Sequence, residues 1–213
     1  MAIDAVLWDY GGVFSASPFE AMERLAESVG VAPDRYVGLI FGPYDRDDDH
    51  PWHRLERGEI SLGDARDQIL ELGRAEGVEA DLLHFIAAMA KEGIGVRDEV
   101  VALAREVKSS GTGTALVTNN IAEFREHWRK SIPIDELFHH VVDSSEVGLR
   151  KPDPRIFELA LEKVGAADPG RTVFLDDYAG NVKAARRVGI QGILVTSDFG
   201  EALDELRALL AAS

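Results

Sequence analysis

Apolar residues recur at two different spacings along this chain of 213 residues. From Pro18 to about Ala90 they lie three and four positions apart, with interruptions at Gly30 and at Gly42-Pro43. That spacing is typical of amphipathic helices, which glycine and proline commonly end. From Val96 onward, short continuous apolar runs alternate with helical segments. The first pattern predicts a block of helices, and the second predicts a parallel sheet covered by helices on both faces.

Five short apolar runs are expected to form the strands of this sheet. They cover residues 5–8, 114–117, 139–142, 172–175 and 193–195. The first run precedes the helical block and the other four follow it, so the block is expected to be an insertion after the first strand. We therefore predict an α/β core made of residues 1–15 and 93–213, with an inserted all-helical cap made of residues 16–92. The chain is expected to cross between them near Ser15 and near Gly93-Ile94-Gly95.

Polar residues follow four of these runs, at the positions where the strands are expected to end. Asp9 follows the first run, Thr118 the second, Ser144-Ser145 the third and Asp176-Asp177 the fourth. The carboxyl ends of parallel strands meet at one edge of a sheet, where open α/β sheets bind their ligands. Any one of these residues alone is explained as a turn residue. Together with Lys151, which precedes a predicted helix, they predict a crevice suited to a phosphate group and a divalent cation.

Composition limits the partners of the chain. It carries 38 acidic and 23 basic residues, for a formal net charge of −15. That charge disfavours nucleic acid and anionic membrane surfaces as partners. The absence of cysteine excludes disulfides and thiolate zinc sites. No apolar stretch approaches the roughly 18 residues of a membrane span, and Asp4 lies where a signal peptide carries positive charge. A cytoplasmic location is therefore the expectation.

Four short motifs carry a resemblance to a known family. They are Asp9-Tyr10-Gly11-Gly12-Val13, the apolar run into Thr118-Asn119, Arg150-Lys151-Pro152, and Asp176-Asp177 with Asn181. In order and spacing they resemble the four motifs of the haloacid dehalogenase-like hydrolases. Residues 53–61 and 148–157 look like the branch that holds a bacterial α-D-glucose-1-phosphate phosphatase and the N-terminal phosphatase domain of soluble epoxide hydrolase. The resemblance implies a Rossmann-like α/β core, with strand order 5-4-1-2-3, and a helical cap.

The resemblance also implies a hydrolase that removes phosphate from small metabolites, sugar phosphates among them. Asp9 would be the nucleophile and would form an aspartyl-phosphate. Lys151 would neutralise the phosphate. The Thr118 hydroxyl and the Asn119 backbone N–H would hold the phosphate oxygens.

Mg²⁺ would be the cofactor, because it takes oxygen ligands in an octahedron and keeps several waters. The resemblance implies that Asp9, the backbone carbonyl of Gly11 and Asp177 would be its protein ligands. Asp176 would bind the ion through water or would orient the lysine. Asn181 would pack locally or support the loop of Asp177.

One position departs from the family pattern. Most phosphatases of the superfamily carry a second aspartate two residues after the nucleophile, where it protonates the leaving group, and here that residue is Gly11. A missing general acid typically slows a reaction by about 10²–10⁴-fold. One interpretation is a substrate whose oxygen leaves easily, such as a sugar 1-phosphate or acetyl phosphate. Alternatively, His50 or His53 of the predicted cap would contact the substrate and act in place of the acid, or the site would bind and turn over slowly.

Two other functions match parts of the pattern. A 2-haloacid dehalogenase also uses an aspartate nucleophile but needs no metal. The pair Asp176-Asp177 argues against it, because crowded carboxylates are costly without a cation. A catalytically weak binding or regulatory protein would keep the fold and lack the acid at Gly11. We therefore expect a Mg²⁺-dependent phosphatase with a small phosphorylated substrate, whose identity the sequence leaves open.

Overall fold

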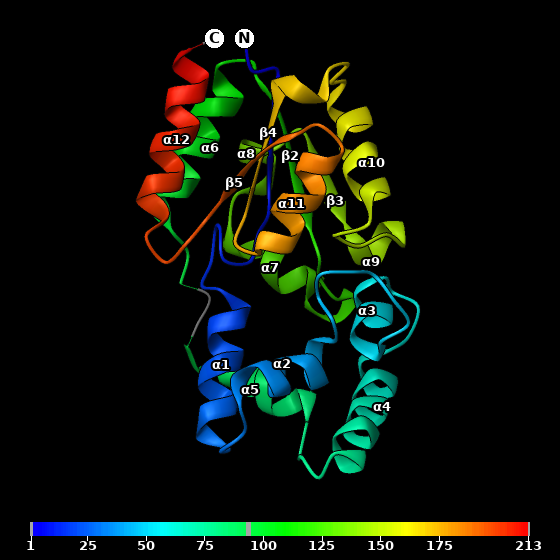
Figure 1. Ribbon diagram of the computed structural model, residues 1–213. Coiled ribbons are helices and arrows are strands. Elements are labelled where there is room, and N and C mark those ends of the chain that lie inside the picture. Colours follow the sequence, from blue (N-terminus) through cyan, green and yellow to red (C-terminus); the bar gives the residue numbers. More distant parts are fainter. Residues whose placement is uncertain (1, 93–94, 213) are drawn as a thin grey trace.

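The computed structural model describes residues 2–92 and 95–212. Its sheet has five parallel strands in the order β3-β2-β1-β4-β5, which confirms the predicted order and fold class (Figure 1). Each predicted strand is present, with ends that differ by at most two residues from those expected. The strands are β1 (Ala5–Trp8), β2 (Gly113–Thr118), β3 (His140–Asp143), β4 (Thr172–Asp176) and β5 (Gln191–Leu194).

Helices cover both faces of the sheet. Helices α6 (Asp98–Ser109) and α12 (Phe199–Ala211) pack on one face, and α10 (Pro154–Val164) and α11 (Ala179–Arg187) pack on the other (Figure 1). Along β1, Val6 and Trp8 belong to the first core, whereas Leu7 belongs to the second. This is the two-residue alternation of a strand, and two covered faces explain why β1 is apolar throughout. Shorter helices follow β2 and β3, namely α7 (Arg125–Ser131), α8 (Ile134–Leu137) and α9 (Ser144–Val147).

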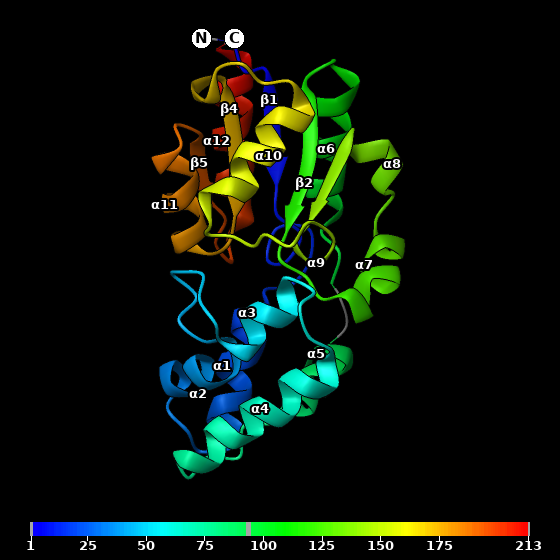
Figure 2. The ribbon, with the colours of Figure 1, turned by 90° about the vertical axis from the view of Figure 1, so that its right-hand side faces the viewer.

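Five further helices form a separate group beyond the carboxyl ends of the strands (Figure 2). Proline opens the first three, at the position where its fixed φ and missing N–H suit a helix start. Ser61 caps the fourth in a capping box with Asp64. The group has its own apolar cluster, which includes Tyr36, Ile40 and Ile69. The helices are α1 (Pro18–Ser28), α2 (Pro33–Phe41), α3 (Pro51–Glu56), α4 (Leu62–Ala75) and α5 (Leu82–Glu92).

The described part of residues 16–92 contains helices and no strand. We call residues 16–92 the cap; its division from the core stays a prediction. Ser15 of the first expected crossing lies shortly before α1, whereas Gly93 and Ile94 of the second lie outside the described residues. Within the described ranges, no helix has the length and apolar character that crossing a membrane requires.

Candidate active site

Asp9 is the first residue after β1, and its backbone N–H donates to the Leu175 carbonyl oxygen at 2.9 Å. Its side chain is buried, and Oδ1 lies 2.7 Å from Nζ of Lys151. Gly12 follows with a φ of 69°. A Cβ at Gly12 would lie 2.0 Å from Oδ2 of Asp177, so only glycine lets Asp177 come this close to the loop after Asp9. The local backbone thus brings the first and fourth motifs together.

Asp9, Asp176 and Asp177 form an acidic cluster in which one carboxylate oxygen of each lies within 4.8 Å of the others. Burial raises the pKa of Asp9 well above its usual range; Lys151 opposes this rise, and the two other carboxylates add to it. Burial and the charge of Asp176 raise the pKa of Asp177 to about 7. When all three carboxylates are ionised, the cluster therefore carries more negative charge than Lys151 balances. Carboxylate oxygens are the ligands that Mg²⁺ prefers, so the donor set fits that ion.

Lys151 is fixed through both its side chain and its backbone. Nζ donates to Oδ2 of Asp176 at 2.7 Å, in addition to its contact with Asp9. The side chain of Asn119 holds the Lys151 backbone, because Oδ1 accepts from its N–H at 2.8 Å and Nδ2 donates to its carbonyl oxygen at 2.9 Å. Burial lowers the pKa of Lys151, but Asp176 and Asp9 outweigh burial and hold that pKa above its ordinary value. Lys151 is therefore a charged group at a defined position beside Asp9.

Asp176 is the most enclosed carboxylate of the cluster. Its Oδ1 accepts from the Tyr178 backbone N–H at 2.8 Å, and both of its oxygens lie 3.1 Å from Nδ2 of Asn181. Together with the bond from Lys151, these contacts suit the orientation of the lysine, one of the two roles implied for Asp176. Asn181, which is buried in α11, contacts Asp176 through its amide.

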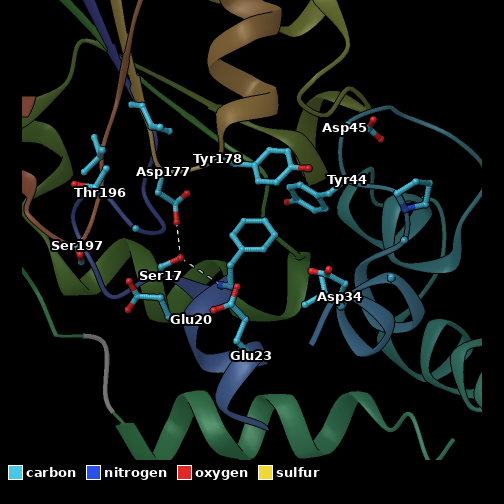
Figure 3. Close-up of a pocket in the computed structure, with 18 of the residues that line it drawn as sticks. Ser17, Glu20, Glu23, Asp34, Tyr44, Asp45, Asp177, Tyr178, Thr196 and Ser197 are labelled. Carbon is cyan, nitrogen blue, oxygen red and sulfur yellow. Dashed lines mark hydrogen bonds between the residues drawn. The ribbon is translucent and has the colours of Figure 1, made fainter. Parts of the chain in front are cut away.

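Asp177 also lines a cleft beside the start of the cap, and its carboxylate contacts the first cap helix there. The hydroxyl of Ser17, at the N-cap of α1, donates to Oδ2 of Asp177 at 2.5 Å (Figure 3). The cleft has a volume of about 860 Å³, and acidic cap residues including Glu20, Glu23 and Asp34 line it together with Asp177 (Figure 3). We call it the acidic cleft. Its charge attracts cations and repels phosphate.

A cavity of about 540 Å³ adjoins Asp9 between the core and the cap. Most of its lining is apolar and comes from the cap helices and from the segment after β2. We call it the apolar pocket. Its apolar members include Phe19, Phe41, Trp52, Phe85, Ile86, Met89, Ile121, Phe124 and Trp128.

Most predicted site residues meet at the apolar pocket. It is lined by Asp9, Gly11, Thr118, Asn119, Lys151 and Asp177, and Asp176 lies against Lys151. Their catalytic and metal-binding roles stay predictions. Asn181 also lines the pocket, as does His127 of α7. His127 was not among the predicted site residues, and no sequence signal distinguished it.

The two histidines predicted to contact substrate line neither cavity. His53 is fully buried, and its Nδ1 lies 2.9 Å from Oδ1 of Asp48. Burial is the main cause that lowers the pKa of His53 to about 3. His50 caps α3, where its Nδ1 accepts from the Trp52 backbone N–H at 3.2 Å. Their contacts are therefore with the cap itself.

A buried ion pair joins the core to the cap beside the site. Nε of Arg150 donates to Oε2 of Glu56 at 2.6 Å, and both side chains are buried. The Tyr44 hydroxyl donates to Oε1 of Glu56 at 2.7 Å, and the Arg150 guanidinium lies 4.6 Å from the centre of the Tyr44 ring. Glu56 and Tyr44 also line the apolar pocket. Sequence reasoning assigned no role to these three residues, and the available signal was that Arg150 directly precedes Lys151.

Known proteins match the chain over most of its length. The model of the haloacid dehalogenase-like hydrolases matches residues 3–189. Acyl-CoA dehydrogenase family member 10 of Mus musculus is 32% identical over 97% of this chain, which spans only 19% of that protein. Sesquiterpene phosphatase astK of Aspergillus oryzae is 31% identical over 75% of this chain and 79% of its own length. Phosphorylated carbohydrates phosphatase of Thermotoga maritima is 27% identical over 97% of this chain and 93% of its own length.

Solved structures share the fold at lower sequence identity. A HAD family enzyme of Bacteroides thetaiotaomicron, in complex with magnesium and inorganic phosphate, has a TM-score of 0.63 at 22% identity, with 92% of this chain and 96% of that chain covered. A dehalogenase with an intermediate complex has a TM-score of 0.67 at 18% identity, with 99% and 98% covered. The fold alone therefore does not select the reaction. By its family match and by the four motifs gathered around Asp9, the chain belongs to the haloacid dehalogenase-like hydrolases.

Proposed function

We propose that this hydrolase is a Mg²⁺-dependent phosphatase that acts on small phosphate monoesters through an aspartyl-phosphate on Asp9. The observation that carries the proposal is that Asp9 lies beside Lys151 and shares an acidic cluster with Asp177. A carboxylate can attack a phosphate dianion only where positive charge brings the two anions together. Lys151 supplies one such charge, and the acidic cluster has the ligands for a second.

The proposed reaction has two steps. An Asp9 carboxylate oxygen attacks phosphorus in line with the ester oxygen, so that an O–P bond to Asp9 forms while the ester P–O bond breaks. The alkoxide departs with the ester oxygen and takes up a proton from solvent. Water then attacks the same phosphorus and gives a proton back to solvent, while the bond to Asp9 breaks and inorganic phosphate is released.

The neighbouring groups hold the phosphate during both steps. Lys151, the Thr118 hydroxyl and the Asn119 backbone N–H would bind its oxygens. Mg²⁺ held by Asp9, the Gly11 carbonyl and Asp177 would neutralise phosphate charge. Asp176 would keep Lys151 in place. We also propose that residues 1–15 and 93–213 act as the catalytic core, with residues 16–92 as the cap that closes the pocket.

The names of two relatives support a phosphatase. One is named a sesquiterpene phosphatase and the other a phosphorylated carbohydrates phosphatase, so their named substrates differ. The activity common to both names is the one that we carry over to this chain. The alcohol part of the substrate depends on the pocket.

Dehalogenation is the reaction that the fold also accommodates, and the site disfavours it. A haloacid brings its own carboxylate, which needs a cationic partner. Without a metal, Lys151 alone would have to balance this carboxylate as well as those of Asp9 and Asp176, with which it is already paired. A metal-free site would also leave the buried charge of the acidic cluster uncompensated.

The direct test is phosphate release from a panel of phosphate monoesters and acetyl phosphate, with Mg²⁺ or with a chelator. We expect Mg²⁺-dependent release that Asp9→Asn abolishes. Calorimetric titration should show at least about tenfold weaker Mg²⁺ binding in Asp177→Asn. It should show unchanged binding in Asp49→Asn, whose side chain is 97% exposed.

Two results would overturn the proposal. Chloride release from 2-chloropropionate without metal would favour a dehalogenase. Mg²⁺ binding without turnover of any phosphate compound would favour the binding protein that lacks an acid at Gly11.

A further inference from the structure

We propose that the alcohol part of the substrate is an apolar group, aromatic or aliphatic, that fills the apolar pocket in place of a sugar. This inference rests on the phosphatase function proposed above. It concerns the part of the substrate that does not react.

The cap side of the apolar pocket, which we call the cap wall, consists mainly of aromatic side chains that pack against one another. The ring centre of Phe41 lies 4.8 Å from that of Trp52, 5.1 Å from that of Phe85 and 5.6 Å from that of Phe19. These four residues come from four different cap helices, and all four line the pocket. Rings that support one another hold a preformed apolar surface, against which an apolar group loses little on binding.

Other parts of the chain extend this surface. Ile86 and Met89 of α5 add aliphatic side chains from the cap. The core contributes Ile121, Phe124 and Trp128 after β2. Pockets of about 300–1,000 Å³ are typical for small molecules, and the volume of about 540 Å³ lies within that range.

Among the polar groups of the cap wall, the Glu56 carboxylate and the Tyr44 hydroxyl are already engaged, whereas the indole N–H of Trp52 has no hydrogen-bond partner among the described residues. Both carboxylate oxygens of Glu56 accept hydrogen bonds, one from Arg150 and one from the Tyr44 hydroxyl. A sugar would give up hydrogen bonds to water for each buried hydroxyl and would meet mainly aromatic and aliphatic carbon. An apolar group loses nothing of this kind and gains from leaving water.

The phosphate position determines which cavity holds the alcohol. Asp9, Thr118 and Lys151 line the apolar pocket and are not among the lining residues of the acidic cleft. The carboxylates of the cleft, Glu20 and Glu23 among them, would also repel the phosphate dianion. An ester whose phosphorus is in reach of Asp9 therefore extends its alcohol into the apolar pocket.

The test uses phenyl, 4-ethylphenyl and 4-butylphenyl phosphate with Mg²⁺, because the alkyl group lengthens the apolar part while the leaving oxygen stays nearly the same. We expect kcat/KM to rise about two- to fourfold per methylene until the pocket is filled. Glucose 1-phosphate, whose anomeric oxygen also leaves readily, is expected to react at least about tenfold less efficiently. A flat series, or a preference for glucose 1-phosphate, would overturn the inference.

Two further measurements separate this inference from the phosphatase proposal. Turnover of acetyl phosphate without any gain along the aryl series would remove the apolar pocket as substrate site and leave the phosphatase standing. If no compound is turned over, calorimetric binding of the same aryl phosphates to the Mg²⁺-loaded wild type still tests the pocket. Affinity that fails to rise with alkyl length would then reject it.

A matched pair of variants on α5 tests whether the gain in kcat/KM with alkyl length arises in the apolar pocket. Met89→Gln changes a pocket residue, whereas Leu83→Gln changes an exposed leucine of the same helix outside the pocket lining. We expect the ratio of kcat/KM for 4-butylphenyl to that for phenyl phosphate to fall several-fold in Met89→Gln and to stay at the wild-type value in Leu83→Gln. An unchanged ratio in Met89→Gln, with its thermal unfolding intact, would count against the pocket.

Discussion

The hydroxyl of Ser17 lies 2.5 Å from Oδ2 of Asp177 and ties the first helix of the cap to the acidic cluster of the core. The same hydroxyl oxygen accepts from the Phe19 backbone N–H at 3.3 Å, as an N-cap does. One side chain thus fixes both the start of α1 and the orientation of a predicted metal ligand. Cap position and metal affinity should therefore be linked through it.

The first prediction concerns Ser17→Ala. Without the hydroxyl, the Asp177 carboxylate loses a hydrogen bond that favours its charged form, so Mg²⁺ binding should weaken about tenfold, as is usual for outer partners of metal ligands. Calorimetric titration measures this. Ser28→Ala, at the other end of α1 with an exposed hydroxyl, is the control and should bind as the wild type does. Equal affinity in all three proteins would show that Ser17 serves the helix alone.

The second prediction concerns the pH dependence of Mg²⁺ binding. Burial and Asp176 hold the pKa of Asp177 at about 7 instead of its ordinary value of 3.8. Above pH 7 the carboxylate is charged and available, whereas below pH 7 a proton competes with the ion. Affinity should therefore fall by up to about tenfold per pH unit between pH 7 and pH 5 and level off above pH 8. Titrations at several pH values would contradict this if affinity were constant across the range.

The third prediction concerns the buried pair of Arg150 and Glu56. Arg150→Met leaves a buried carboxylate without its cation, which should cost about 3–5 kcal/mol in the free energy of unfolding. The double variant with Glu56→Leu should cost less than the sum of the single changes, and denaturant unfolding of all four proteins gives the coupling energy.

An exposed pair provides the comparison for this cycle. Arg35 and Glu76 are each about half exposed, and their pairing should contribute no more than about 1 kcal/mol. A coupling between Arg150 and Glu56 as small as this would mean that the buried pair does not hold the cap on the core.

The sheet and the position of the site followed from the sequence because each depends on local pattern plus one rule of topology. Apolar runs such as residues 5–8 and 172–175 are short and buried, and parallel strands bring their carboxyl ends together. Asp9 and Asp177 could therefore be placed at the same edge of the sheet from the pattern, whereas the strand order that makes them neighbours came from the family resemblance. The close approach itself depends on Gly12, whose positive φ and missing side chain make room for Asp177.

The cap wall could not be predicted in the same way. Phe41 and Phe85 lie at helical spacing that suits either a cap interior or a pocket surface, and both belong to the cap's apolar cluster and to the lining of the apolar pocket. Periodicity reports that a face is apolar and does not report what covers it. His50 and His53 illustrate the converse: their chemistry suits a site, but their burial inside the cap depends on contacts that the sequence does not show.

The last prediction concerns Gly11 and the proton that the leaving alcohol needs. A Cβ at Gly11 would lie 3.4 Å from Cδ of Pro18, an ordinary van der Waals distance, and Gly11 is not among the glycines with positive φ. Gly11→Asp therefore places an acid in the pocket without backbone strain. We expect benzyl phosphate, whose alkoxide leaves poorly, to gain up to about 10²-fold in kcat/KM, and phenyl phosphate to gain little. Gly11→Asn, which has the same shape but no acidic proton, is the control.

The wild-type enzyme should show a steep fall of kcat/KM as the pKa of the leaving alcohol rises across such esters, and Gly11→Asp should flatten it. If the wild type is already flat, another group donates the proton or chemistry is not rate-limiting. His127 and Glu56 line the apolar pocket and are the side chains to replace in that case. A steep dependence that appears only in His127→Ala would assign the acid to His127. The same result in Glu56→Gln alone would assign it to Glu56, despite the hydrogen bonds that both of its oxygens accept.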